Sequence, residues 1–526
     1  MKILVADSVP DNIIGILKAD PSWEVVNLPK TKGQIAEEIR DADALLVRSA
    51  TKVTSQLLEN AKRLVVIGRA GVGVDNVDLE AATRKGVLVM NTPGGNAISV
   101  AEHTMTLLLA MAHPVAQADA SMKAGKWEKK KFTGSELRDK TLGLIGLGTI
   151  GTEVARLAQA HKMTVVAYDP YVSAVLATEQ NIRLLSLEEV LQTSDFISLH
   201  CSLTPETMHL INAKTLVLTK KGVRIINCAR GELVDEAALL AALDSGHVAG
   251  AGLDVFNAEP PADPRLVKHH NVLATPHIAG STEEAQQVVG TRIAEQLRDY
   301  LLTGAVRNAV NMPAVSPEEF KKLEPYIQLG EKLGTFIAQL ADKPIAEVSI
   351  SYDGGLADLN THLVKNAVLK GVLGQILAEQ INLINAGNLA KARGIEVVEV
   401  RSARRAAYAN SLGVALQTAG ESASVLGMIG LNGSLRILGV NNIDIEAPLK
   451  GFLLLIRNQD VPGVIGRVGT LLGQHKINIA NFALGRVQDS KEALGLVNVD
   501  QKVSAEVLGE LRAIPAVRQA RIIEIR

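Results

Sequence analysis

Short apolar runs alternate with segments of helical spacing through the first half of the chain. Before residue 98 these runs are Lys2–Ala6, Ala44–Val47, Leu64–Ile67 and Val87–Met90. Runs of this length, bounded by polar loops, are typical of buried strands. Their alternation with helices predicts a parallel sheet covered on both faces, and therefore an α/β domain.

The same alternation resumes after an apolar helix, which we expect over Ser99–Ala112 and which Pro114 ends. Residues 141–281 then have the pattern of a second, doubly wound sheet. Beyond them, Ser281-Thr282-Glu283-Glu284 predicts a capping box that opens a long helix. Because that helix would carry the chain back to the first domain, we expect the second domain to be inserted in the first, with a cleft between them.

The C-terminal part of the chain has a different pattern. The stretch 311–317 contains two prolines and is the best candidate for a linker. Residues 318–450 combine a helical segment at about 359–391 with strands such as Glu396–Arg401. From Gly451 the order is βαββαβ, the split-βαβ arrangement. We therefore expect an α+β domain followed by a smaller unit.

The stretch Thr141–Gly151 carries the clearest chemical signal. A strand-like run leads into Gly146, Gly148 and Gly151, with the G-x-G-x-x-G spacing of a dinucleotide-binding turn. The next strand-like run ends at Asp169, where a carboxylate can bind both ribose hydroxyls of NAD and would repel the 2′-phosphate of NADP. A turn without a ligand is the alternative for the glycines alone. The strand, helix, second strand and acid together favour NAD.

Three polar side chains follow strands of the first domain, namely Arg48, Arg69 and Asn96. Ligands of open α/β sheets bind beyond the carboxyl ends of the strands, so we expect these side chains to face one cleft. The alternative is that the arginines are solvated or paired with local carboxylates.

Three further candidates follow strands of the second domain, namely Arg230, Glu259 and His277. Hydride transfer between an alcohol and NAD needs an acid/base on the substrate oxygen, and histidine suits this role near neutral pH. A carboxylate on the other ring nitrogen would fix the tautomer, and an arginine can grip a 2-hydroxy or 2-oxo carboxylate in a fork. Each residue alone could be structural, but together, beside a dinucleotide turn, they indicate oxidation of a hydroxy acid.

The composition of the chain limits the partners, metal sites and cellular locations that we expect. The 526 residues carry 55 basic and 56 acidic side chains, which gives no argument for a nucleic-acid or membrane partner. The two cysteines have no metal-ligand spacing, so we expect neither a metal nor a disulfide framework. The N-terminus lacks a signal-peptide pattern and no apolar stretch is long enough to span a bilayer, so we expect a cytoplasmic protein.

The motifs together resemble the D-isomer-specific 2-hydroxyacid dehydrogenases. The resemblance rests on the glycine turn and on Asn227–Gly231, Asp254–Pro260 and Thr275–His277, while Val47–Thr51 and Gly68–Asp78 are similar to members that act on phosphoglycerate. It covers the whole chain and implies the long form, with an intervening and an ACT domain. The implied domains are a flavodoxin-like substrate domain (1–98 and 282–312), a Rossmann-like NAD domain (99–281), an intervening domain (313–450) and an ACT domain (451–526).

The resemblance also implies an activity and residue roles. The reaction is NAD-dependent oxidation of 3-phosphoglycerate to 3-phosphohydroxypyruvate, at the entry to serine synthesis. His277 is implied as acid/base, Glu259 as its partner and Arg230 as the carboxylate-binding arginine. The substrate contacts implied are Arg48, Arg69, Gly71 and Asn96. The cofactor contacts implied are Gly146, Gly148, Thr149, Ile150, Gly151, Asp169, Cys201, Cys228, Ala229, Arg230, Asp254, His277, Ala279 and Gly280.

Two positions depart from the family pattern. Val72 replaces a threonine of some relatives, and Thr149 replaces a frequent arginine near the pyrophosphate. Two rival functions stay open: a dehydrogenase for another D-2-hydroxy acid, and an NAD-sensing corepressor. The two cleft arginines favour a phosphorylated substrate over the first rival, and the ACT tail disfavours the second.

The ACT resemblance implies an effector and a homo-oligomer. Asp460 follows the first strand of this unit and Asn478 opens the next, and we expect these two places to lie close together. There Asp460 could pair with the ammonium group of L-serine and Asn478 with its carboxylate or hydroxyl, at a site formed between two paired domains. A domain that only dimerises is the alternative. The lysines at 129–131 lie where the family supplies basic residues from a neighbouring subunit of a dimer or tetramer.

Overall fold

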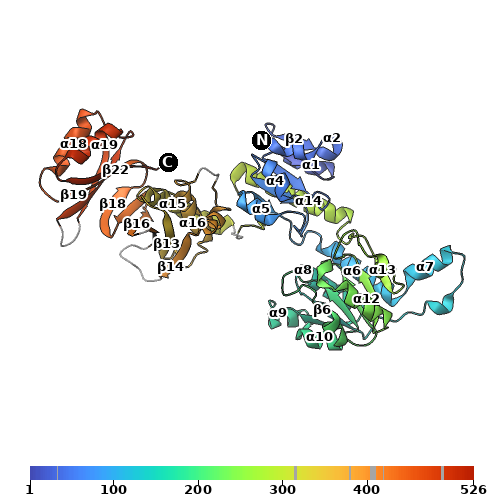
Figure 1. The fold of residues 1–526 in the computed structure, drawn as a ribbon. Helices are drawn as coiled ribbons and strands as arrows, with labels where there is room; N and C mark the ends of the chain where they lie inside the picture. Colours follow the sequence, from blue (N-terminus) through green and yellow to red (C-terminus); the bar gives the residue numbers. More distant parts are fainter. Residues whose placement is uncertain are drawn as a thin grey trace.

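The computed structural model describes residues 1–31, 33–312, 317–377, 381–402, 410–418, 420–486 and 491–525. These residues form four sheets, each in a unit of its own, and Figure 1 shows the units in an extended arrangement. The unit drawn in orange to red lies at one end and the unit drawn mainly in green at the other. Residues 313–316 of the expected linker lie outside the described residues.

The first sheet is parallel, with strand order β2-β1-β3-β4-β5, which is the flavodoxin-like order. The strand expected at Leu64–Ile67 begins two residues later, because its pairing with β3 aligns Ala44 with Val66 and Val47 with Arg69. Strand β2 was not among the strands expected. The strands are β1 (Lys2–Val5), β2 (Glu24–Asn27), β3 (Ala44–Val47), β4 (Val66–Arg69) and β5 (Leu88–Met90). The helices and turns between them are α1 (Asp11–Leu17), α2 (Leu28–Thr31), α3 (Ile35–Glu38), η1 (Ile39–Asp41), α4 (Ser55–Asn60) and α5 (Leu79–Arg84).

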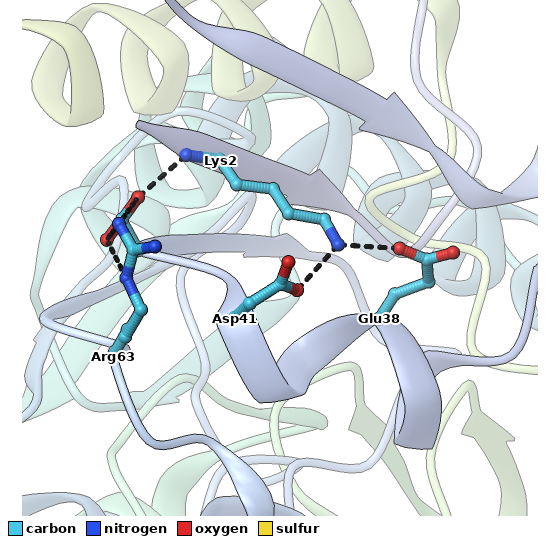
Figure 2. A network of polar contacts seen from close by, with 5 residues as sticks. Lys2, Glu38, Asp41 and Arg63 are labelled. Atoms are coloured by element: carbon cyan, nitrogen blue, oxygen red, sulfur yellow. Dashed lines mark hydrogen bonds and ion pairs between the residues drawn. The ribbon is translucent and has the colours of Figure 1, made fainter.

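Charged side chains form a network of hydrogen bonds and ion pairs at the amino-terminal edge of this sheet (Figure 2). The ammonium group of Lys2 donates to Glu38 at 2.7 Å and to Asp41 at 2.6 Å, while its backbone N–H and the Arg63 guanidinium share Asp43. Burial opposes the charge of Lys2, but the hydrogen bonds to Asp41 and Glu38 outweigh it and raise the pKa of this group. The charged side chains Lys2, Asp41, Asp43 and Arg63 are therefore paired with one another at this edge.

The long helix α14 (Glu283–Thr303) returns to the first domain and packs on α1 and β4. The capping box expected from Ser281 is wrong. Thr282 is the N-cap, and its side chain accepts from the backbone N–H of Ala285. The backbone N–H of Ser281 instead donates to the carbonyl of Ile278, and this hydrogen bond holds Ser281 in the preceding turn.

The second sheet is parallel and doubly wound, with strand order β12-β11-β10-β9-β6-β7-β8. Helix α6 (Ala97–Ala112) leads into it and packs on α8. The strands are β6 (Thr141–Ile145), β7 (Thr164–Tyr168), β8 (Arg183–Leu184), β9 (Phe196–Leu199), β10 (Val223–Asn227), β11 (Val248–Leu253) and β12 (Val272–Ala274). The helices and turns are α7 (Val115–Lys123), η2 (Lys129–Lys131), α8 (Thr149–Ala160), α9 (Ala174–Glu179), α10 (Leu187–Thr193), α11 (Ala213–Val217), η3 (Gly231–Leu233), α12 (Glu236–Asp244) and α13 (Pro264–Val267).

The third unit is a six-stranded sheet of order β14-β13-β15-β16-β17-β18. The helical segment expected at about 359–391 is two helices, since α16 ends at Leu373 and α17 begins at Ala386. The helices are α15 (Pro317–Ala338), α16 (His362–Leu373) and α17 (Ala386–Ala392). The strands are β13 (Ile345–Gly354), β14 (Glu396–Ser402), β15 (Asn410–Thr418), β16 (Glu421–Ile429), β17 (Leu435–Val440) and β18 (Ile443–Pro448).

The fourth unit has the expected βαββαβ order, and its sheet order is β20-β21-β19-β22. One face of this sheet packs on its own two helices, and Leu453, Leu455 and Leu496 on the other face share a core with the third unit. The third and fourth units are therefore joined by a continuous apolar core. The elements are β19 (Gly451–Gln459), α18 (Val464–Gln474), β20 (Ile479–Arg486), β21 (Glu492–Val499), α19 (Ala505–Ala513) and β22 (Val517–Ile525).

Two kinds of feature are absent from the part of the chain that the structure describes. Within it, no helix combines the length and the apolar character needed to cross a membrane. Among the same residues, no group of three or more His, Cys, Asp or Glu side chains is placed to hold a metal ion.

Candidate active site

The glycine turn between β6 and α8 has the geometry that a dinucleotide requires. Gly146 has φ +97°, and a Cβ there would lie 2.6 Å from the backbone nitrogen of Cys201. A Cβ on Gly151 would lie 2.3 Å from the carbonyl oxygen of Gly146, so only glycine allows this close packing. Gly148 is the N-cap of α8 and faces open space. A pyrophosphate can therefore approach the backbone at the start of this helix.

Asp169 lies at the end of β7, beside this turn. Its carboxylate accepts from the backbone N–H of Leu147 at 2.8 Å and from that of Tyr171 at 2.8 Å. These bonds fix the carboxylate next to the glycine turn, where the ribose of a bound dinucleotide would reach it. The residues around the turn therefore fit a nicotinamide dinucleotide.

The other expected cofactor contacts follow neighbouring strands on the same edge of the sheet. Cys201 follows β9, Cys228 and Ala229 follow β10, and Asp254 follows β11. Burial raises the pKa of Cys228 to about 12 and also raises the pKa of Cys201, so both thiols stay protonated near neutral pH. Neither cysteine is suited to act as a nucleophile.

Asp254 organises the turn that carries Ala279 and Gly280. Its side chain is fully buried and accepts from the Thr275 hydroxyl at 2.6 Å and from the backbone N–H groups of Ile278 and Ala279 at 2.9 and 2.8 Å. Burial opposes its charge, but hydrogen bonds from His103 and Thr275, then from these N–H groups, hold the pKa of Asp254 below its usual value. Sequence reasoning missed His103, a polar position on the mostly apolar helix α6.

His277 and Glu259 form a hydrogen-bonded pair at this edge. The distance from His277 Nδ1 to Glu259 Oε2 is 2.8 Å, and Glu259 Oε1 accepts from the backbone N–H of Phe256 at 3.2 Å. His277 has φ +52°, which is uncommon for a residue other than glycine, and its backbone N–H donates to the carbonyl of Asp254. The pair is about half exposed, so the ring is oriented by the protein and still open to a ligand.

The candidate substrate residues gather around a carboxylate. Arg230 Nη2 lies 2.9 Å from Asp75 Oδ2, and this ion pair joins the loop after β10 to the loop after β4. Burial and the positive charge of Arg230 lower the pKa of Arg69, and Arg48 adds a smaller effect in the same direction. Arg69 Nε is buried without a hydrogen-bond partner, and Gly71 leaves the space that its guanidinium occupies. The structure thus brings Arg48, Arg69 and Arg230 together, with an excess of positive charge.

Asn96 completes this region. Asn96 lies at the start of α6 with its buried Oδ1 unpartnered, and its amide is next to Gly280. Sequence reasoning quoted the loop that contains Asp75 without assigning the residue a role. The available signal was an acidic position shortly after Arg69, in the same strand-end loop.

Asp460 and Asn478 do not lie together, and that expectation is wrong. Strand β21 pairs with both β19 and β20, and its pairing aligns Gln459 with Glu492 at one end and Ile479 with Val499 at the other. Asp460 instead pairs with Arg486 at 3.0 Å, and the Asn478 amide donates to Asp500 at 2.7 Å. The two residues are at opposite ends of one sheet, so a site containing both would need a second copy of this unit.

Comparison with known families covers three of the four units. Residues 105–279 match "D-isomer specific 2-hydroxyacid dehydrogenase, NAD binding domain". Residues 322–441 match "D-3-phosphoglycerate dehydrogenase intervening domain", and residues 452–516 match "ACT domain".

Full-length relatives agree with these matches. The chain is 44% identical over 526 residues to the D-3-phosphoglycerate dehydrogenase of Methanocaldococcus jannaschii, with 100% of each chain covered. It is 40% identical over 524 residues to the enzyme of that name from Bacillus subtilis, covering 100% of this chain and 99% of that one. Among solved structures, D-lactate dehydrogenase from Aquifex aeolicus in complex with NAD and lactic acid is 31% identical, with a TM-score of 0.52. The match covers 60% of this chain and 100% of that one.

Proposed function

The chain belongs to the D-3-phosphoglycerate dehydrogenases of the D-isomer-specific 2-hydroxyacid dehydrogenase family, and on that basis we propose how its residues perform the reaction. The reaction is oxidation of 3-phosphoglycerate to 3-phosphohydroxypyruvate, the first step of serine synthesis. The observation that carries the proposal is the His277–Glu259 pair, on the same strand-end edge of the second sheet as the dinucleotide turn and Arg230.

Each residue has one task in the proposed mechanism. A nicotinamide dinucleotide held by the glycine turn and Asp169 would supply the acceptor for the hydride on the substrate C2. Arg230 holds the substrate carboxylate, and Arg48 and Arg69 hold its phosphate by charge-assisted hydrogen bonds. His277 takes the proton of the C2 hydroxyl on its free Nε2, while Glu259 keeps the proton on Nδ1 and stabilises the resulting imidazolium. In the reverse direction His277 returns the proton.

An assay of NADH formation with a panel of D-2-hydroxy acids tests this function. We expect turnover with 3-phosphoglycerate and little with glycerate or D-lactate, because only the first presents a phosphate to Arg48 and Arg69. Equal turnover of glycerate and 3-phosphoglycerate would instead indicate a dehydrogenase for another D-2-hydroxy acid.

Cofactor choice is the first finer proposal. We propose that Asp169 makes the enzyme prefer NAD, since its carboxylate is fixed beside the glycine turn and would repel a 2′-phosphate. Replacing Asp169 by alanine should weaken NAD binding and reduce the preference for NAD over NADP. The ratio of kcat/KM with the two cofactors measures this preference. Asp195→Asn, on a neighbouring strand connection, is the control and should leave the ratio unchanged. Equal use of both cofactors by the unaltered protein would contradict the proposal.

Effector binding is the second finer proposal. We propose that L-serine binds between two ACT domains, with Asp460 from one and Asn478 from the other. Gly463 at the start of α18 has φ +91° and no side chain caps this helix, so backbone N–H groups there are open to a carboxylate.

Calorimetric titration of the full chain with L-serine tests this site. Asp460→Ala should weaken binding by about 10-fold or more, since a hydrogen bond to a charged group contributes about 1.5–3 kcal/mol. The control Glu506→Gln removes an exposed charge from α19 and should bind normally. Equal heats of L-serine binding to Asp460→Ala and to the unaltered protein, or no heat from either, would contradict this site. The domain would then serve only in dimerisation.

The remaining proposals concern assembly. We propose a homo-oligomer, dimer or tetramer, in which the segment of α7 and η2 contacts a neighbouring subunit. Val115, Met122 and Trp127 on this segment are exposed apolar side chains, and Lys129–Lys131 lie beside them. We also propose a cytoplasmic location and the domain boundaries 1–98 with 282–312, 99–281, 313–450 and 451–526.

A further inference from the structure

The ion pair between Asp75 and Arg230 crosses from one catalytic domain to the other. Asp75 lies on the loop between β4 and α5 of the first domain, and Arg230 follows β10 of the second. The Asp75 side chain is 66% exposed and the Arg230 side chain 29% exposed, so the carboxylate stands at the open side of the pair. Arg230 Nη1 is already bound to the carbonyl of Ala229 at 2.7 Å. Asp75 therefore occupies Nη2, the other terminal nitrogen of the guanidinium.

Gly73 provides the space for this pair. A Cβ on Gly73 would lie 2.0 Å from Arg230 Nη2 and 2.7 Å from Asp75 Oδ2. Both charged atoms thus lie over the same Cα. A carboxylate that replaced Asp75 at Nη2 would sit above this glycine.

The charge balance around Asp75 favours such an exchange. Arg48, Arg69 and Arg230 are close enough for the other two arginines to lower the pKa of Arg69, while Asp75 acts in the opposite direction. Asp75 is therefore a counter-ion of the cluster when no substrate is bound. A substrate that brings a carboxylate and a phosphate makes this counter-ion unnecessary and places it among like charges.

We propose that the Asp75 carboxylate holds Arg230 in the place of the substrate carboxylate, and that the substrate displaces it on binding. The inference rests on the proposed function and deepens it, because it makes Asp75 a positioning residue that sets substrate affinity. In the free enzyme the pair joins the two domains and keeps Arg230 aimed at the cleft. On binding, the substrate carboxylate takes Nη2 above Gly73 and Asp75 turns to solvent.

The test compares KM and kcat of Asp75 variants with 3-phosphoglycerate and NAD. Asp75→Asn should lower KM about two- to fivefold with kcat nearly unchanged, because the displaced ion pair is exposed and such pairs are weak. Asp75→Glu keeps the charge and should restore a KM near that of the unaltered protein. The control Glu24→Gln removes one negative charge from the start of β2, at the opposite edge of the same sheet, and should leave both constants unchanged.

A second variant tests where the substrate carboxylate binds. Gly73→Ala should raise KM both in the unaltered chain and together with Asp75→Asn, since the methyl group takes the space above the glycine. Calorimetric titration of 3-phosphoglycerate into each protein with NADH bound gives the affinities without turnover and should show the same order.

Two results would overturn the inference. A KM that rises or stays the same in Asp75→Asn would show that the carboxylate does not compete with substrate. A KM insensitive to Gly73→Ala would show that the substrate carboxylate binds elsewhere. Both results compare the KM of a variant with the KM of the active unaltered enzyme. Failure of the proposed function is recognised separately, because the unaltered enzyme would then not oxidise 3-phosphoglycerate.

Discussion

Replacing His277 by alanine should lower kcat by about 10²- to 10⁴-fold, which is the usual contribution of general acid–base catalysis. The ring is the group oriented for proton transfer, because Glu259 holds Nδ1 at 2.8 Å and the backbone N–H is tied to Asp254. The glycine turn does not depend on this side chain, so NADH binding should be nearly unchanged. Steady-state kinetics and a fluorescence titration with NADH measure the two quantities.

Two further variants serve as comparisons for His277→Ala. Glu259→Gln keeps a hydrogen-bond acceptor but removes the charge beside the imidazolium, so kcat should fall less than in His277→Ala. His161→Ala removes an exposed histidine at the end of α8 and should leave kcat unchanged. Full activity of His277→Ala would remove the proposed mechanism.

Replacing Arg69 by alanine should raise KM for 3-phosphoglycerate by about 10- to 150-fold and lower kcat much less. The range corresponds to about 1.5–3 kcal/mol for a hydrogen bond to a charged group. Arg69 suits this role because its Nε is buried without a partner, while burial and the neighbouring arginines disfavour its charge in the free protein. The folded state therefore gains little from this guanidinium, and we expect thermal unfolding of the variant at an unchanged or higher temperature.

A raised KM together with unchanged thermal stability would distinguish a substrate-binding role of Arg69 from a structural role. The control Arg40→Ala removes an exposed arginine from the η1 turn, at the amino-terminal edge of the same sheet, and should change neither KM nor stability. A large loss of stability in Arg69→Ala without a change in KM would assign Arg69 to the fold and leave the phosphate without its proposed partner.

The position of the candidate site followed from strand ends. The cleft candidates Arg48 and Arg69 and the catalytic candidates Arg230, Glu259 and His277 were predicted to follow apolar runs, and the structure places those runs in two parallel sheets. The carboxyl ends of parallel strands share one edge, so residues far apart in the chain could be grouped from the sequence alone. The fold class was predicted in the same way, because a period-two or continuous apolar run and a 3.6-residue spacing are local properties.

The errors arose where a local pattern allowed more than one answer. Ser281 and Thr282 are both good N-caps, and the turn bond from Ser281 to Ile278 decided between them. Strand β4 is shifted by two residues from the apolar run Leu64–Ile67, because pairing with β3 set where β4 begins. The helical segment expected at 359–391 is two helices, and before the second one Asn382 and Asn385 donate to the backbone carbonyls of Gly86 and Arg84 in the first domain, a long-range contact that no local pattern indicates.

The sequence by itself determined the chemistry available to this protein: a glycine turn spaced for a dinucleotide, an acid at the end of the next strand, and histidine, glutamate and arginine after later strands. These are consequences of residue type and short-range spacing. Only the tertiary structure decided which groups meet, including Asp75 with Arg230 across the two domains and the placement of Asp460 and Asn478 at opposite ends of a sheet. Such pairings depend on strand register and domain packing, which are set by contacts between residues distant in the chain and leave no local pattern.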